Sequence, residues 1–179
     1  MWPMQPTFLF IERSSEREPA FPIEVYLSGP DEGANGFLVN PEGVHRWDGW
    51  PREFLVVHDI RDEDVRVYGM PPVVICSQVA PILTSHLIYS QAPDRDRRLL
   101  QELFAASELP CPELRLDDVR TLYMDMLLAK CYDVDHSQIL LDSLATQVRG
   151  QFGCRGGAWE LPFLWGLWHT VRKTEDAPN

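Results

Sequence analysis

One short apolar segment near the N-terminus constrains what this chain can build. Thr7-Phe8-Leu9-Phe10-Ile11 is followed directly by Glu12 and a polar turn. An apolar run of this kind is typical of a buried strand. Residues two apart on a strand project from the same face, so Phe10 and Glu12 are expected to lie side by side. The sequence therefore predicts a strand that delivers Glu12 to one end of a sheet, where the role of this carboxylate depends on its neighbours.

The length of the chain favours a single domain. A chain of 179 residues is long enough for one substantial core and too short for two. We expect the domain to cover residues 1–173, with a polar tail over 174–179. No apolar run approaches the roughly 20 residues that span a bilayer, and the N-terminus lacks the features of a signal peptide. We therefore expect no membrane partner and a cytoplasmic location.

Charge and cysteine content narrow the possible partners. The net charge of −11 argues against general attraction to phosphate backbones and suits a basic protein partner. The basic residues are nearly all arginine, which recognises phosphate and carboxylate in a bidentate way. Four scattered cysteines without a CxxC spacing are expected to be reduced thiols rather than zinc ligands or disulfides.

Periodicity predicts an α/β chain. Three strands, separated by turns rich in Gly, Pro and Asp, are expected to form an antiparallel meander over residues 7–12, 20–27 and 36–39. Helices and short strands then alternate. They are expected in this order: a helix near 60–65, a helix over 73–83, a strand at 86–89, a helix from 93, a strand at 113–116, and helices over 119–130, 136–149 and 159–171.

Local signals set several of these boundaries. Pro81 is expected to end or kink the helix over 73–83. Asp135 is expected to cap the helix over 136–149, and Gly150 to break it. This order of elements predicts a mixed sheet, an antiparallel three-stranded meander plus parallel strands, flanked by helices.

Five motifs occur in order along the chain: Phe8–Ser15, Pro22–Val25, Trp47–Trp50 with Val57–Ile60, Tyr89–Asp96, and Cys154–Trp159. This set resembles the DEDD family of proofreading-type 3′–5′ exonucleases, in which the corresponding motifs read approximately F-x-D-x-E-A-S-S, P-I-E-I-A, a tryptophan loop with V-H-G-I, Y-S-D-A-P-x-x-D, and H-R-A-x-x-D. The resemblance covers residues 7 to 172 and implies a ribonuclease-H-like fold.

The resemblance also implies a chemistry. In the family, four carboxylates hold two Mg²⁺ or Mn²⁺ ions that activate a water for phosphodiester hydrolysis, and a histidine acts as general base. Glu12 stands at the second acid of the first motif. Asp96 stands at the third acid, with Asp94 as its competitor. Glu12 and Asp96 are therefore the candidate catalytic and metal-binding remnants, and Mg²⁺ or Mn²⁺ is the implied cofactor if the site functions.

Three family positions carry other residues. Phe10 stands in place of the first aspartate, Cys154 in place of the histidine and Trp159 in place of the last acid. An apolar ring cannot bind a hard cation. A rearranged site would have to recruit other groups, and the candidates are His136, Asp142, Glu160 and His169. Without such a set, Glu12 is expected to pair with a nearby arginine, for which Arg13, Arg97 and Arg98 are available.

Five residues are candidates for contact with nucleic acid. Arg95, Arg97 and Arg98 stand at a helix start, where they contact a phosphate or form a mixed-charge surface with Asp94 and Asp96. Trp47 and Trp50 stack on a base or pack on the sheet edge. The tryptophan loop and the tryptophan-rich last helix are also the candidate interfaces of a homodimer.

The resulting prediction is an exonuclease-like protein without catalysis that binds a single-stranded nucleic-acid end or a protein partner. Two alternatives remain open. One is an active metal-dependent 3′–5′ exonuclease with rearranged ligands. The other is an acidic inhibitor or adaptor that binds a basic protein.

Overall fold

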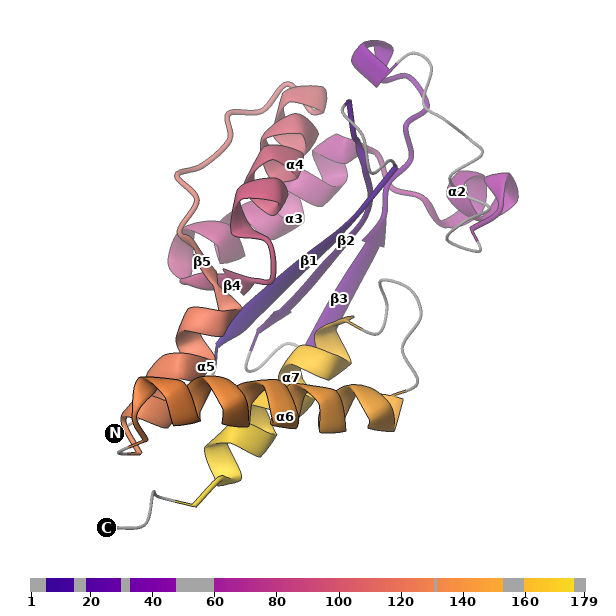
Figure 1. Ribbon diagram of the computed structural model, residues 1–179. Coiled ribbons are helices and arrows are strands. Elements are labelled where there is room, and N and C mark those ends of the chain that lie inside the picture. Colours follow the sequence, from indigo (N-terminus) through magenta and orange to yellow (C-terminus); the bar gives the residue numbers. More distant parts are fainter. Residues whose placement is uncertain are drawn as a thin grey trace.

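The fold is described from a computed structural model of the chain, over residues 6–14, 19–29, 33–47, 60–130, 132–152 and 160–175. Within these ranges the chain forms a five-stranded sheet with helices on both faces (Figure 1). None of the helices in these ranges is long and apolar enough to cross a membrane.

The sheet has the strand order β3-β2-β1-β4-β5. The first three strands pair antiparallel, as predicted, whereas β4 pairs parallel with β1 and β5 pairs parallel with β4. The strands are β1 (Thr7–Arg13), β2 (Pro22–Gly29), β3 (Gly33–Leu38), β4 (Ile88–Ser90) and β5 (Leu116–Asp118). The predicted mixed sheet is confirmed.

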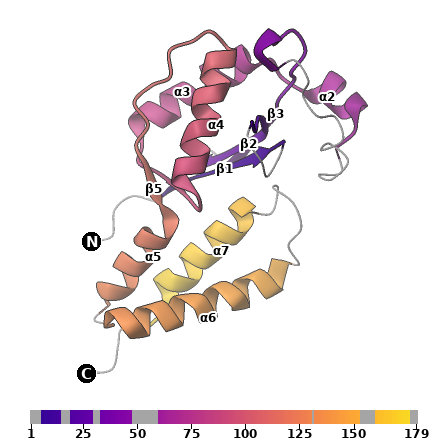
Figure 2. The same cartoon turned by 45° about the horizontal axis from the view of Figure 1, so that its top comes forward.

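Alternation along β1 separates the two halves of the core. Leu9 and Ile11 face helices α3 (Pro72–Ser85) and α4 (Pro93–Ala106). Phe8 faces the opposite side, where α5 (Val119–Leu128) and α7 (Glu160–Lys173) pack on the sheet. Helix α6 (Val134–Phe152) packs in turn on α5 and α7 (Figure 2). Because both faces of β1 are covered, its sequence is almost continuously apolar. Two smaller helices, η1 (His45–Trp47) and α2 (Asp62–Tyr68), follow β3 along the chain.

The predicted helix end at Pro81 is wrong. Helix α3 continues through Pro81 and ends at Ser85. Proline removes one backbone donor, so the carbonyl oxygen of Ser77, one turn earlier, loses its helical partner. Pro81 lies on the exposed side of the helix, where water can satisfy this carbonyl. Apolar packing of the other side of α3 therefore outweighs the local break signal.

The predicted boundaries of α6 are also wrong. The helix begins at Val134, and Asp133 rather than Asp135 provides the capping oxygen, since its carboxylate accepts from the backbone N–H of His136 at 2.8 Å. Gly150 does not break the helix, which ends at Phe152. An exposed glycine inside a helix costs only about 1 kcal/mol, which the packed side of α6 offsets.

The strand predicted at 113–116 lies instead at Leu116–Asp118. Arg97 binds this segment, since its guanidinium donates to the carbonyl oxygens of Leu114 at 2.8 Å and Leu116 at 3.3 Å. A side chain thus satisfies backbone groups that a strand partner would otherwise bind. The pairing with β4 is set by apolar Ile88, which aligns with Leu116.

The tryptophans predicted at a dimer interface are used inside this chain. Trp47 and Trp168 are only 2% and 5% exposed. Trp165 packs edge-on against Trp168, with ring centroids 5.5 Å apart, and its Nε1 donates to Ser28 at 2.7 Å. Trp50 lies outside the described residues. Of the described tryptophans, Trp47 and Trp168 are therefore buried within this chain and Trp165 is half-buried, and the homodimer stays a prediction.

Replacing Leu100 with alanine tests the core between the sheet and α4. Leu100 is fully buried, so Leu100→Ala is expected to lower the free energy of unfolding by about 2–5 kcal/mol. Urea denaturation measures the change. The neighbouring Gln101→Ala, on the exposed side of the same helix, is the control and should change stability by less than about 0.5 kcal/mol. Equal effects of the two substitutions would contradict the assigned orientation of α4.

Candidate functional site

Glu12 lies near the end of β1, on the sheet face that it shares with Phe10. Across the β1–β2 pair, Glu12 aligns with Glu24 and Phe10 aligns with Tyr26. The hydroxyl of Tyr26 donates to Glu24 at 2.8 Å. Burial, followed by the charges of Glu24 and Glu12, raises the pKa of Tyr26 above its usual value. The phenol therefore stays protonated and acts as a donor between two carboxylates.

A glycine makes room for this arrangement. Gly36 of β3 aligns with Tyr26, whose ring lies across it. A Cβ added at Gly36 would lie 2.8 Å from the nearest ring carbon of Tyr26. Any larger residue at this position would push the ring, and with it the hydroxyl that holds Glu24.

Phe10 is surrounded by groups unrelated to metal binding. Its ring packs against Tyr26, with centroids 6.3 Å apart. The guanidinium carbon of Arg95 lies 5.8 Å from the centroid of Phe10, within the range of a cation–π contact. The place beside Glu12 on β1 is thus occupied by an aromatic ring with a protein cation next to it.

Asp96 is buried in the first turn of α4, close to the end of β4. The Ser90 hydroxyl donates to its Oδ2, and Arg95 donates from Nε to its Oδ1 at 2.7 Å. A second nitrogen of Arg95, Nη2, also lies 2.7 Å from Oδ1. Burial raises the pKa of Asp96, while Arg95, Ser90 and Arg13 act in the opposite direction.

The two predicted metal ligands, Glu12 and Asp96, each have contacts within the protein. Both carboxylate oxygens of Asp96 are already bound by Ser90 and Arg95. Oε1 of Glu12 lies 3.4 Å from the backbone N–H of Arg13. In the described part of the chain, no group of three or more His, Cys, Asp or Glu side chains is placed to hold a metal ion. Cys154 and Trp159, the other two substituted positions, lie outside it.

The four residues predicted for a rearranged site each contact other groups of the protein. Glu160 accepts from Gln91 at 2.7 Å, which joins the start of α7 to the end of β4. His136 pairs with Asp133 at 2.6 Å, and Asp142 pairs with Arg120 at 3.0 Å. His169 packs against Trp165 and Trp168. None of these four residues belongs to a group of three or more His, Cys, Asp or Glu side chains placed to hold a metal ion in the described part of the chain.

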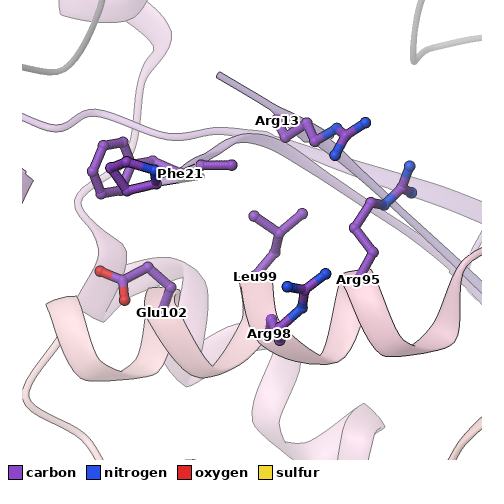
Figure 3. A pocket seen from close by; sticks show the side chains of 8 residues that line it. Arg13, Phe21, Arg95, Arg98, Leu99 and Glu102 are labelled. Carbon is purple, nitrogen blue, oxygen red and sulfur yellow. The ribbon is translucent and has the colours of Figure 1, made fainter. Parts of the chain in front are cut away.

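Two of the three predicted phosphate-contacting arginines meet a third one at a cavity. Arg95 and Arg98 of α4 and Arg13 of β1 line a space of about 160 Å³, with Leu99, Glu102 and residues 19–21 completing the wall (Figure 3). Arg97 lies apart from it, bound to the backbone before β5. Trp47 is buried, and its Nε1 donates to Glu102 at 2.7 Å.

Arg13 lines this cavity in addition to its predicted role as a charge partner of Glu12, and the sequence carries a signal for this position. It follows Glu12 directly and is therefore expected to project from the other side of β1. Residues 95, 98, 99 and 102 have the spacing of one helix face. Seen together, these two patterns predict arginines on facing elements.

The Arg95–Asp96 pair is expected to control stability in a pH-dependent way. Burial raises the pKa of Asp96 in the folded protein above its pKa in the unfolded chain, which is near 3.9. The free energy of unfolding therefore falls as the pH rises from the pKa of the unfolded chain through the pKa of the folded protein. Arg95→Ala removes the cation that opposes this shift and should lower stability by about 3–5 kcal/mol near pH 8, less near pH 4. Urea denaturation at both pH values measures this.

The double variant Arg95→Ala/Asp96→Asn is the control for this experiment. It removes the buried charge together with its partner, so it should recover much of the stability lost near pH 8 and show a weaker dependence on pH. A single variant whose stability loss is the same at both pH values would contradict the assigned pair.

Comparison with known proteins supports the fold. No family model matches the sequence, and no curated protein matches it. Among solved structures, Escherichia coli exonuclease I in complex with a 5cy-dT13 oligonucleotide is similar with a TM-score of 0.52 at 12% identity, over 69% of this chain and 30% of that chain.

Exonuclease I with the inhibitor BCBP gives a TM-score of 0.53 at 12% identity, over 68% of this chain and 30% of that chain. The complex of SSB and exonuclease I with the inhibitor CFAM gives a TM-score of 0.52 at 13% identity, over 68% of this chain and 30% of that chain. This chain therefore spans about 30% of the length of the exonuclease I chains. At such low identity the similarity establishes an exonuclease-like fold.

Proposed function

We propose that this protein binds the end of a single-stranded nucleic acid without hydrolysing it. The observation that carries the proposal is the position of Arg95. Its guanidinium contacts both the buried carboxylate of Asp96 and the ring of Phe10. In the exonucleases that the sequence resembles, metal ions neutralise the carboxylates at this end of the sheet. Here a protein cation does so for Asp96.

An arginine cannot replace the chemistry of a metal ion. A metal ion lowers the pKa of a bound water and provides a nucleophile at neutral pH. A guanidinium has no coordination position for water and keeps its proton at all physiological pH values, so it cannot act as general base. It does bind phosphate well, through paired N–H donors. The residues present therefore favour binding over hydrolysis.

Local charge explains how an acidic protein can bind a polyanion. The chain carries −11 overall, which disfavours broad contact with a phosphate backbone. Three arginines nevertheless gather at one cavity beside the start of α4. Binding is therefore expected to be confined to this place and limited to a few phosphates. The exonuclease I structure with an oligonucleotide is similar over this fold and supports the choice of a single strand.

Fluorescence anisotropy with a labelled single-stranded oligonucleotide tests the proposal. We expect binding that does not require a divalent metal ion, and no shortening of the strand with Mg²⁺ or Mn²⁺. Arg98→Ala should weaken binding about tenfold through loss of a charge-assisted hydrogen bond. It should also reduce the slope of log affinity against log salt by about one.

Arg66→Ala is the matched control, since Arg66 is an exposed arginine on α2 and its loss changes the net charge equally. It should leave affinity and salt dependence nearly unchanged. Metal-dependent degradation that is abolished by Glu12→Gln would refute the proposal and favour a rearranged active site. Absence of any oligonucleotide binding, with a stable protein partner recovered instead, would favour the adaptor alternative.

A further inference from the structure

We infer that the cavity lined by Arg13, Arg95 and Arg98 binds a phosphate monoester, the group found at a phosphorylated strand end. The inference deepens the proposed function and rests on it only for the source of the phosphate. We call this cavity the arginine pocket.

Two elements build the arginine pocket from opposite sides. Arg95, Arg98 and Glu102 of α4 lie on one face of the helix, on either side of the buried Leu99. Figure 3 shows Arg13 on the strand opposite them, with Phe21 and Glu102 at the other side of the pocket. The two segments that carry Arg13 and Phe21 are tied by Ser14, whose backbone N–H donates to the carbonyl oxygen of Phe21 at 2.8 Å. Ser14 also accepts from the Phe21 backbone N–H, at 2.9 Å to Oγ.

The lining of the pocket is rich in arginine. Three of its eight lining residues are arginines, and one, Glu102, is acidic. Glu102 is already neutralised, since Arg46 donates to its Oε2 at 3.0 Å and lies 2.9 Å from its Oε1. Trp47 donates to Oε1 of Glu102 as well. The carboxylate of Glu102 is therefore held towards Arg46 and Trp47. Arg95 is paired with Asp96 through Nε and Nη2, and a guanidinium has five N–H donors in all.

One guanidinium is held in place before any ligand arrives. Arg95 is fixed by two contacts of 2.7 Å to the buried Asp96. Its remaining donors keep a defined direction, which reduces the entropy lost on binding. Arg98, in contrast, is exposed and can be replaced without disturbing the core.

Size and charge favour a terminal phosphate over an internal one. The space of about 160 Å³ is well below the roughly 300 Å³ at the lower end of small-molecule sites, so it suits one small anion rather than a nucleotide. A phosphate monoester carries close to two negative charges at neutral pH and offers three oxygens. An internal phosphodiester carries one charge and has a sugar on each side. Three arginines at a small cavity therefore match the monoester better.

The test compares three oligonucleotides of the same sequence by fluorescence anisotropy. The first ends in hydroxyl groups, the second carries a terminal phosphate, and the third carries the same phosphate as a methyl ester. The comparison is made twice, once with the phosphate at the 5′ end and once with the phosphate at the 3′ end. The monoester should bind about tenfold tighter than the hydroxyl form at one of the two ends. The methyl ester should lose most of this advantage, because one charge and one acceptor are removed.

Variants locate the effect. Arg13→Ala and Arg98→Ala should each abolish most of the preference for the monoester, whereas Arg66→Ala should keep it. Arg98→Lys retains the charge but not the bidentate geometry, and should restore only part of the preference. Circular dichroism confirms that the variants are folded. A preference that persists in both alanine variants would place the phosphate elsewhere and overturn the inference.

Titration with inorganic phosphate, followed by calorimetry, separates this inference from the proposed function. If inorganic phosphate binds the wild type but not Arg98→Ala, while no oligonucleotide binds, the arginine pocket stands and the proposed function fails. If all three oligonucleotides bind equally well, the proposed function stands and the phosphate-monoester inference fails. Binding of neither phosphate nor oligonucleotide would overturn both.

Discussion

The buried contact between Arg95 and Asp96 is the interaction on which the rest of the site depends. Asp96 is fully buried, and an isolated carboxylate in such a place would be strongly disfavoured. Ser90 and Arg95 provide its partners, so one side chain joins the end of β4 to the start of α4. The same guanidinium reaches the Phe10 ring on β1. A buried ion pair is weak evidence of net stability, but it fixes the geometry of three elements relative to one another.

Two residues of opposite charge, Glu12 and Arg13, follow each other at the end of β1. Glu12 lies on the face that carries Phe10, Tyr26 and Glu24, where two carboxylates stand opposite each other across the strand pair. Like charges in this position are unfavourable, and the Tyr26 hydroxyl reduces the cost by donating to Glu24. The register of the β1–β2 pair shifts between Glu12 and Arg13, and Arg13 lines the pocket with α4. Glu12 therefore belongs to an acidic cluster, whereas its neighbour Arg13 lines the arginine pocket.

The sequence predicted the mixed sheet and most of the elements because their apolar periodicity is set by the two-sided core. It failed where tertiary contacts outweigh a local signal: Pro81 and Gly150 lie on exposed helix surfaces, and Arg97 holds the segment before β5. Asp96 was recognised from a motif, but its partners were not, because hydrogen bonds to Ser90 and Arg95 depend on how β4 and α4 meet. In the arginine pocket, Arg13 meets residues of a helix that lie more than 80 positions later in the sequence. Periodicity within one segment does not predict contacts between segments so far apart.

Neutralisation by a protein cation has a consequence for the evolution of activity on this fold. A carboxylate that depends on metal ions for its counter-charge is destabilising when the metal is absent, because burial penalises its ionised form. An arginine that pairs with it permanently removes this dependence and adds donors suited to phosphate. An aspartate in place of Phe10 would put a second carboxylate near Arg95, where it would compete with Asp96 for the guanidinium and repel its charge. As long as Ser90 and Arg95 donate to Asp96, both of its carboxylate oxygens are occupied by groups of the protein itself.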